Sequence, residues 1–305
     1  MLDRLFSPLT INGKTLKNRC VVTPMLMNFC EEDGTCTERF AAYHEAKAKG
    51  GFAMIVTENV AVTSVAKGYQ WIPGLWKDEH IPGFRDLTDR VHQYDTVIIA
   101  QLNHPGRQAS EKYAKAQSWA PSAIPDPYHN EEMPHEMTIA EIHKTVEDFG
   151  DAALRAKKAG FDGIELHGAH GYMIPEFMSM YTNKRTDEYG NQSLENRCRF
   201  IDEIIAGIRA KLGRYPISVR ICGDEMTDEP GFLTLEDGLE IGRHLEAQGI
   251  DCINISNGSS WNGNANCEPF SYTPGWKKHV AKAFKEALSI PVIATNTIKD
   301  PNFAE

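Results

Sequence analysis

The chain has 305 residues, of which 41% are hydrophobic and 24% charged, and its formal net charge is −10. This composition is typical of a globular protein with enough apolar side chains for a large core. The acidic balance argues against a nucleic-acid partner, because neutralising phosphates requires an excess of lysine and arginine.

Apolar and helical segments alternate along the chain after a short hairpin around Asn12-Gly13, which we expect to cover the bottom of the main sheet. Apolar runs predict strands at 20–24, 96–102, 216–221 and 290–296, and at the ends of the segments 47–56, 157–166 and 246–255. Helical patterns lie between them at 37–49, 80–93, 138–159, 193–211, 234–248 and 276–288.

Three segments repeat one phrase: KAKGGFAMIV at 47–56, KKAGFDGIEL at 157–166 and EAQGIDCINI at 246–255. Each reads as a helix end, a glycine suited to a positive φ, and a strand that is apolar throughout, as in a parallel sheet buried on both faces. Strand–helix alternation on this scale predicts an α/β fold, a TIM (β/α)8 barrel. An eighth strand is missing, so we expect one domain over 1–305 whose barrel is truncated after strand seven.

Polar side chains follow several of these strands. Gln101, His167, His170, Tyr172 and Arg220 would converge on one mouth, because the carboxyl ends of barrel strands meet there. The long loop 103–137 follows the same edge, where it would either shape a binding site or be a tolerated insertion.

Arg220 lies inside the apolar run PISVRI. Strand alternation puts it on the face opposite Ile217, Val219 and Ile221, so we expect it to point into the barrel. It would form either a salt bridge to a barrel carboxylate or a fixed positive charge beside an anionic ligand. Gln101 offers a donor and an acceptor together, which suits the edge of a heterocycle.

The stretch HGAHGY, residues 167–172, holds two histidines and a tyrosine. Zinc would need a third protein ligand, and none is evident, so we expect no metal. Two neutral imidazoles that donate to a substrate oxygen, with Tyr172 as proton source, are the favoured interpretation. Loop histidines satisfied by the backbone are the remaining alternative.

Longer motifs resemble the old yellow enzyme family of FMN-dependent ene-reductases. They are HGAHGYMIPEFMSMYTNKRTDEYG, AQLNHPGRQA, LENRCRF and the N-terminal LFSPLTINGKTLKNRCVVTPM, in order over nearly the whole chain. The segment PVIATNTIKDP resembles the branch of 2,4-dienoyl-CoA reductases and enoate reductases.

The resemblance implies a TIM barrel with FMN in its mouth and a role for each matching residue. The isoalloxazine would pack along Thr23, Pro24, Met25 and Leu26. Cofactor contacts would also come from the main chain of Glu58 or Thr57, from Gln101 at the pyrimidine ring, from Arg220 near N1 and O2, and from Asn296. His167 and His170 would hold the carbonyl oxygen of the substrate, and Tyr172 would protonate its Cα. Leu26 stands where many relatives carry Thr or Cys.

The function that follows is an oxidoreductase that takes hydride from NAD(P)H and reduces an activated C=C bond in a small unsaturated carbonyl compound: an enone, an enoate or a dienoyl thioester. The alternative is a truncated, non-catalytic barrel fragment of a longer flavoenzyme. Long relatives add an iron–sulfur motif and a second nucleotide-binding domain, so a 4Fe-4S cluster and FAD are expected only in a longer parent chain. An oligomer is possible.

Seven cysteines without a C-x-x-C pair are a poor disulfide framework and favour a reducing, cytoplasmic location. The N-terminus lacks the basic-then-apolar order of a signal peptide. No apolar run approaches the roughly 18 residues of a membrane helix, so we expect no membrane partner.

Overall fold

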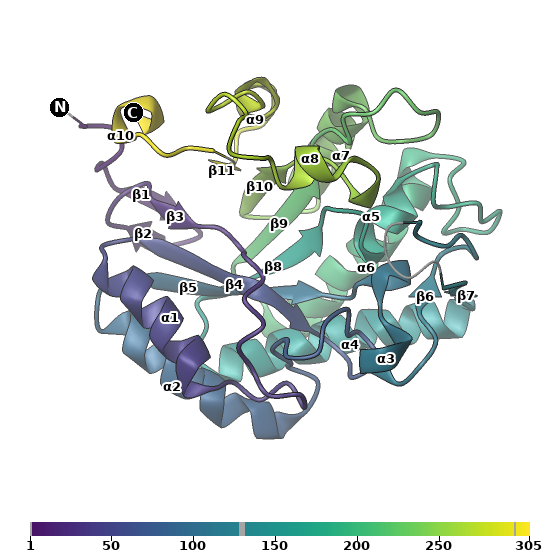
Figure 1. The fold of residues 1–305 in the computed structure, drawn as a ribbon, viewed down its shortest axis with the longest axis horizontal. Helices are drawn as coiled ribbons and strands as arrows, with labels where there is room; N and C mark the ends of the chain where they lie inside the picture. Colours follow the sequence, from purple (N-terminus) through teal and green to yellow (C-terminus); the bar gives the residue numbers. More distant parts are fainter. Residues whose placement is uncertain (1, 128–131, 296) are drawn as a thin grey trace.

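The computed structural model describes residues 2–127, 132–295 and 297–305. Strands and helices alternate as predicted (Figure 1). The strands of the main sheet are β3 (Val21–Val22), β4 (Met54–Ala61), β5 (Val97–Asn103), β8 (Gly163–Gly168), β9 (Ile217–Cys222), β10 (Cys252–Ser256) and β11 (Val292–Ala294). The helices between them are α1 (Glu38–Lys49), α2 (Ile81–His92), α4 (Ile139–Lys158), α6 (Leu194–Leu212), α7 (Leu235–Ala247) and α9 (Lys278–Ala287).

The described residues form a seven-stranded parallel sheet with the order β11-β10-β9-β8-β5-β4-β3. The sheet curls into a nearly closed barrel with its helices outside, and β3 and β11 are its two edges (Figure 1). Inward and outward side chains alternate: Ile217, Val219 and Ile221 belong to the large core that also holds the buried faces of the helices. The barrel predicted from the alternating pattern is therefore confirmed.

The glycines of the repeated sequence motif lie at the ends of the helices, as predicted. Gly160 and Gly249 both have a positive φ, of 92° and 81°. A Cβ on Gly160 would lie 2.7 Å from the Thr88 hydroxyl oxygen, so both the conformation and the space favour glycine. Helix starts carry side-chain caps: Thr138 and Thr234 each accept from the backbone amide three residues on, in a reciprocal capping box.

The predicted hairpin forms the floor of the barrel. Its strands β1 (Leu9–Ile11) and β2 (Lys14–Leu16) pair antiparallel across Asn12-Gly13. Leu16 is buried against a small apolar cluster at the amino ends of the barrel strands, which includes Met54 and Ile99. This closes the end of the barrel opposite the predicted site.

Shorter elements lie in the connecting loops. They are α3 (Glu111–Ala114), β6 (Trp119–Ala120), β7 (His135–Glu136), α5 (Met173–Met178), α8 (Gly263–Asn266), α10 (Pro301–Ala304) and the single-turn helices Asp78–His80, Gly106–Gln108 and Ser260–Asn262. The two chain ends lie side by side, because the Glu305 carboxylate accepts from the amides of Arg4 and Leu5 at 2.9 and 2.8 Å.

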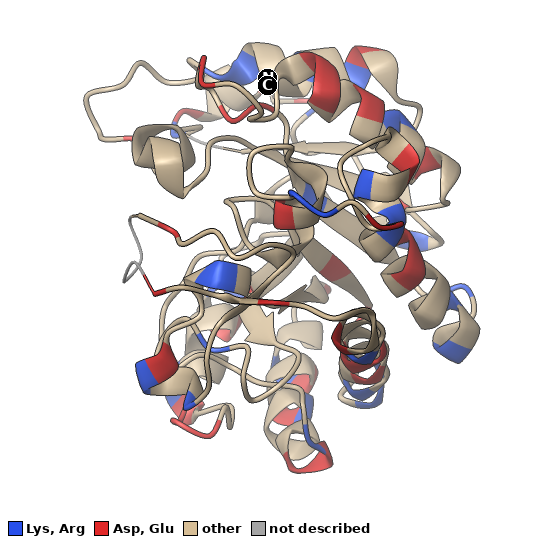
Figure 2. Cartoon of the chain, turned by 90° about the vertical axis from the view of Figure 1, so that its right-hand side faces the viewer, with Lys and Arg blue, Asp and Glu red and all other residues tan. Residues whose placement is uncertain are grey.

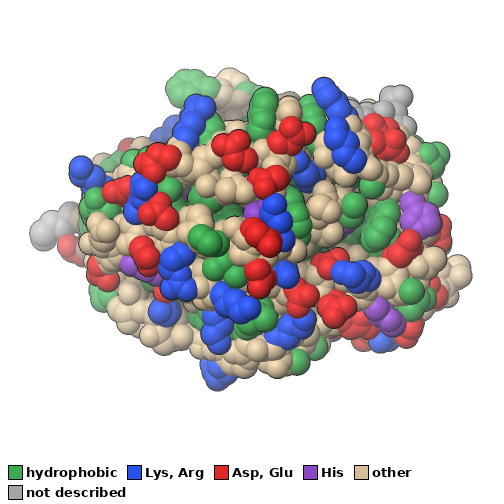
Figure 3. Space-filling view, turned by 90° about the horizontal axis from the view of Figure 1, so that it is seen from below, with side chains coloured by type: hydrophobic (Ala, Val, Ile, Leu, Met, Phe, Trp, Pro, Cys, Tyr) green, Lys and Arg blue, Asp and Glu red, His purple; other side chains and the backbone are tan. Residues whose placement is uncertain are grey.

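Acidic and basic residues are interspersed along the outer helices (Figure 2). The face in Figure 3 likewise mixes both signs with apolar side chains. Within the described ranges, no helix is long and apolar enough to cross a membrane.

Candidate active site

The strand ends bring the predicted polar side chains together at the carboxyl end of the barrel. His167 of β8 lies opposite Arg220 of β9 in the strand register, and Gln101 of β5 lies opposite Glu165 of β8. Gln101, His167 and Arg220 are 1%, 4% and 8% exposed. Burial of so many polar groups at one strand edge is typical of a binding site.

A strained turn follows β8. His170 and Gly171 both have left-handed backbone conformations, with φ of 66° and 72°. This conformation costs a non-glycine residue roughly 1–2 kcal/mol, so other contacts must hold it. The Gln108 side-chain amide does so by donating to the carbonyl oxygens of His170 at 2.9 Å and Gly171 at 2.7 Å. Tyr172 then occupies the N-cap position of α5.

The three aromatic side chains of HGAHGY face one another edge to face. The ring centroid of His167 lies 5.1 Å from that of His170 and 4.8 Å from that of Tyr172, and the other two rings are 6.4 Å apart. Among the residues described, no group of three or more His, Cys, Asp or Glu is arranged to hold a metal ion.

Burial sets the protonation of this cluster. It lowers the pKa of His167 and of His170 well below the usual value, and the positive charge of Arg220 adds to the effect. Burial also raises the pKa of Tyr172 above its ordinary range, so both imidazoles are neutral and the phenol keeps its proton at neutral pH. The His170 Nε2 lies 2.7 Å from the Ser256 hydroxyl oxygen, whereas His167 Nδ1 is buried without a partner in the described part of the chain.

Arg220 points into the barrel, as strand alternation predicts. Its guanidinium donates to the Pro24 carbonyl at 3.4 Å and to the Ser256 hydroxyl at 3.3 Å. The pKa of Arg220 is lowered overall, because burial outweighs the opposing effect of the negative charge of Glu165. The oxygens of Glu165 accept hydrogen bonds from other side chains, one of them from Gln101 at 2.9 Å. Arg220 and Glu165 therefore interact through the electrostatic attraction of their charges, without the direct salt bridge that was the alternative prediction for Arg220.

The segment Thr23, Pro24, Met25 and Leu26 follows β3 without regular structure. Pro24 is buried, and its carbonyl accepts from Arg220. Met25 and Leu26 are 61% and 37% exposed, although both are large apolar residues. This stretch therefore presents an apolar surface directly beside the buried guanidinium.

Glu58 ties the same segment to β4. Its carboxylate accepts from the backbone amides of Met27 and Asn28, the latter at 3.1 Å. Burial raises the pKa of Glu58 to about 7, and these two hydrogen bonds act in the opposite direction. A main-chain contact between Glu58 and a cofactor stays a prediction. Asn296, the last predicted cofactor residue, lies outside the described residues.

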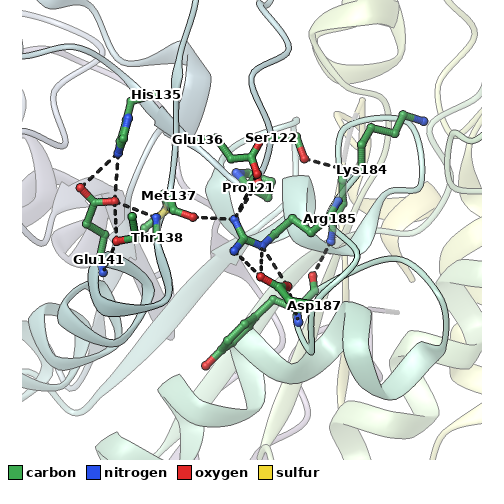
Figure 4. Close-up of polar contacts among 12 residues, drawn as sticks. Pro121, Ser122, His135, Glu136, Met137, Thr138, Glu141, Lys184, Arg185 and Asp187 are labelled. Atoms are coloured by element: carbon green, nitrogen blue, oxygen red, sulfur yellow. Dashed lines mark hydrogen bonds and ion pairs between the residues drawn. The ribbon is translucent and has the colours of Figure 1, made fainter.

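The end of the long motif anchors the loop after β5. Arg185 is 8% exposed and donates to the carbonyls of Pro121 at 3.1 Å and Met137 at 2.5 Å (Figure 4). Its other nitrogens bind the Asp187 carboxylate, with Nε at 3.1 Å from each oxygen. The Lys184 amide also donates to Ser122 at 2.9 Å. The RTDEYG part of the motif therefore holds a loop in place and lies outside the aromatic cluster.

The model of the NADH:flavin oxidoreductase / NADH oxidase family matches residues 4–305. The chain belongs to this family. Membership confirms the resemblance to the old yellow enzymes, and the family supports FMN as cofactor and a nicotinamide as reductant.

Three known proteins show the extent of the likeness. The chain is 40% identical over 304 residues to an NADH oxidase of Thermoanaerobacter brockii, which covers 99% of the chain and 46% of the relative. It is 37% identical over 306 residues to an NADPH dehydrogenase of Bacillus subtilis (strain 168), with 100% of the chain and 87% of the relative covered. The structure of 2-naphthoyl-CoA reductase in complex with 2-naphthoyl-CoA has a TM-score of 0.93 and 30% identity over 100% of this chain and 48% of that one. The chain thus spans about half the length of two of these proteins and most of the third.

The residues present fit FMN. An isoalloxazine ring has apolar faces and polar edges, and the mouth offers the exposed Met25 and Leu26 beside buried polar atoms. Arg220 Nε is buried without a hydrogen-bond partner in the described ranges, so the guanidinium has a donor to spare. Gln101 and Arg220 would hold the polar edge of the ring, and Met25 and Leu26 would pack on its face.

Three important side chains were not predicted from the sequence. Glu165 lies in the apolar run GIELHG, where alternation alone could have placed its carboxylate inside the barrel. Ser256 ends β10 and contacts both His170 and Arg220. Gln108 was visible only as part of a motif, because its partners are 62 and 63 residues away.

Proposed function

We propose that the chain reduces an activated C=C bond in a small unsaturated carbonyl compound, with NAD(P)H as reductant and FMN as cofactor. The observation that carries the proposal is the cluster of two neutral imidazoles and one protonated phenol beside Arg220. FMN, held at its polar edge by Gln101 and Arg220, would supply the hydride transfer from the nicotinamide to the substrate Cβ.

His167 and His170 act on the carbonyl group of the substrate. Each neutral imidazole has one N–H to donate, and two such donors stabilise the negative charge that develops on the carbonyl oxygen. Their low pKa values keep them neutral, so they bind the oxygen without giving it a full proton. The Nδ1 of His167 is buried without a hydrogen-bond partner among the described residues, so it has no competing contact within the protein.

Tyr172 supplies the proton for Cα. Its raised pKa keeps the phenol protonated until a strong base forms beside it, which is the condition for a general acid that acts late in the reaction. The phenol ring packs 4.8 Å from the His167 ring, centroid to centroid, so carbonyl binding and proton delivery occur within one cluster.

Tyr172→Phe tests this assignment. Anaerobic stopped-flow should show that NADPH reduces the bound FMN at the wild-type rate, while reoxidation by 2-cyclohexenone slows by about 100-fold or more, a typical general-acid contribution. Tyr94→Phe is the control and should change neither step, because Tyr94 lies just before the amino end of β5, at the end of the barrel opposite the mouth. Equal slowing of both half-reactions would remove Tyr172 from the role of proton donor.

Binding of FMN comes first in the experiment. The purified chain should show a flavin spectrum after addition of FMN, and the spectrum should bleach with NADH or NADPH. Failure to bind FMN would favour the alternative, a non-catalytic barrel fragment of a longer flavoenzyme. The choice among enones, enoates and dienoyl thioesters follows from relative kcat/KM values for one compound of each class.

A further inference from the structure

A buried carboxylate lies at the centre of the barrel, directly below the proposed cofactor edge. Glu165 is fully buried, and its Oε1 accepts from the Gln101 amide at 2.9 Å. Its Oε2 accepts from Ser218 at 3.2 Å and from Asn254 at 3.0 Å. Four neighbouring strands, β5, β8, β9 and β10, each contribute one member of this network.

The network decides how the Gln101 side chain is oriented. An ionised carboxylate only accepts hydrogen bonds, so Gln101 must turn its NH2 group toward Glu165. The amide oxygen and the second N–H are then left for a ligand above. A heterocycle edge that alternates carbonyl and N–H groups needs this donor–acceptor pair in a defined order, and a freely rotating amide would present either order.

Glu165 also provides the countercharge for Arg220. The two side chains lie on adjacent strands and two positions apart in the register, since Glu165 pairs with Ser218 and His167 pairs with Arg220. Burial raises the pKa of Glu165, whereas the charge of Arg220 and the three hydrogen bonds lower it and so favour the ionised carboxylate. Burial lowers the pKa of Arg220, and the charge of Glu165 acts in the opposite direction. A buried negative charge at this position therefore offsets part of the positive charge that the mouth offers to a ligand.

We infer that Glu165 is a positioning residue that orients the Gln101 amide toward the cofactor and tunes the reduction potential of bound FMN by offsetting the charge of Arg220. The inference rests on the proposed function, because it requires that FMN binds in this mouth. It adds a residue that contacts neither the cofactor nor the substrate.

Two variants separate the two effects. Glu165→Gln keeps the shape and removes the charge, whereas Glu165→Asp keeps the charge but withdraws the carboxylate from Gln101 by one methylene. Asp162→Asn is the matched control, because Asp162 is a carboxylate just before the amino end of β8, bound to the Ile98 amide at 2.9 Å and to Lys14 at 2.8 Å. FMN affinity is measured by fluorescence titration, and the midpoint potential by equilibration with a reference dye.

Glu165→Gln should raise the equilibrium constant for reduction of bound FMN at least tenfold. For a two-electron couple, this raises the midpoint potential by about 30 mV. Glu165→Asp should change the equilibrium constant for reduction of bound FMN by less than threefold. The same variant should raise the dissociation constant of FMN at least tenfold. Asp162→Asn should lower the melting temperature and leave both quantities unchanged.

A potential for Glu165→Gln that equals the wild-type value would overturn the inference, as would wild-type FMN affinity in Glu165→Asp. A purely structural role lowers the melting temperature of all three variants and moves the potential of none. If Glu165→Gln does not retain FMN, the affinity of Glu165→Asp decides. Failure of the wild-type chain itself to bind FMN would instead refute the proposed function, so the two failures are distinguishable.

Discussion

Gln108 holds the strained turn that carries His170 and Tyr172, so its removal should damage the site more than the fold. The Gln108→Ala variant loses two hydrogen bonds, of 2.9 and 2.7 Å, to the carbonyls of His170 and Gly171. A lost hydrogen bond costs about 1 kcal/mol, and a buried carbonyl left unpaired costs about 1–3 kcal/mol. We therefore expect the free energy of unfolding to fall by about 2–4 kcal/mol.

The effect on activity follows from the backbone strain of the turn. Without the two hydrogen bonds from Gln108, the left-handed conformation at His170 must compete with conformations that are about 1–2 kcal/mol lower in energy. If about 2.7 kcal/mol of the loss falls on the turn itself, kcat/KM for 2-cyclohexenone should drop about 100-fold, at 1.36 kcal/mol per factor of ten. Reduction of FMN by NADPH should stay within threefold, because that half-reaction does not need the substrate carbonyl.

Urea unfolding and stopped-flow kinetics measure the two quantities. Gln117→Ala is the control, since Gln117 donates to a backbone carbonyl at 2.8 Å but is exposed. Gln108→Glu should be worse than Gln108→Ala at pH 8, because a carboxylate facing two carbonyls can only repel them. A Gln108→Ala enzyme with wild-type kcat/KM would refute the claim that this side chain maintains the turn.

Three further predictions concern the loop anchor, a buried acid and the thiols. Arg185→Ala should lower the free energy of unfolding in urea by about 3 kcal/mol, because two backbone carbonyls lose a buried charged donor. Lys184 is exposed, so Lys184→Ala should change this free energy by less than about 0.5 kcal/mol. Equal effects of the two substitutions would contradict the role of Arg185 in anchoring the loop. Glu58 has a pKa of about 7 in the fold, above its unfolded value, so it binds a proton more readily when folded and its contribution to stability grows as the pH falls. Relative to Glu58→Gln, wild-type stability should rise by about 2.5 kcal/mol from pH 8 to pH 5, at 1.36 kcal/mol per pH unit between the two pKa values; a flat difference would show that the carboxyl is not perturbed. All seven cysteines lie in described parts of the chain, and Cys267 is the one that is exposed. A thiol reagent should therefore modify Cys267 first, as peptide mass mapping would show. Earlier labelling of a buried thiol such as Cys222 would contradict the packing.

The strands, the helices and the general position of the site could be read from the sequence, because each depends on a local signal. The glycines of the repeated phrase, such as Gly160 and Gly249, required a positive φ at the helix ends, and the apolar runs after them could only be buried strands. Once the strands are parallel, their carboxyl ends must meet. His167 and Arg220 therefore had to share one mouth.

The partners within the site were decided only by the tertiary structure. Glu165 is part of an apolar run, and its role depends on Gln101 and Asn254, which lie 64 and 89 residues away on other strands. Arg185 belongs to the motif that carries the family resemblance, yet packing places it on the loop carbonyls of Pro121 and Met137. The pKa directions in the mouth depend in the same way on burial, which no single residue determines. Local sequence specifies which elements form, whereas register and packing specify which side chains meet, because contacts between strands depend on every element between them.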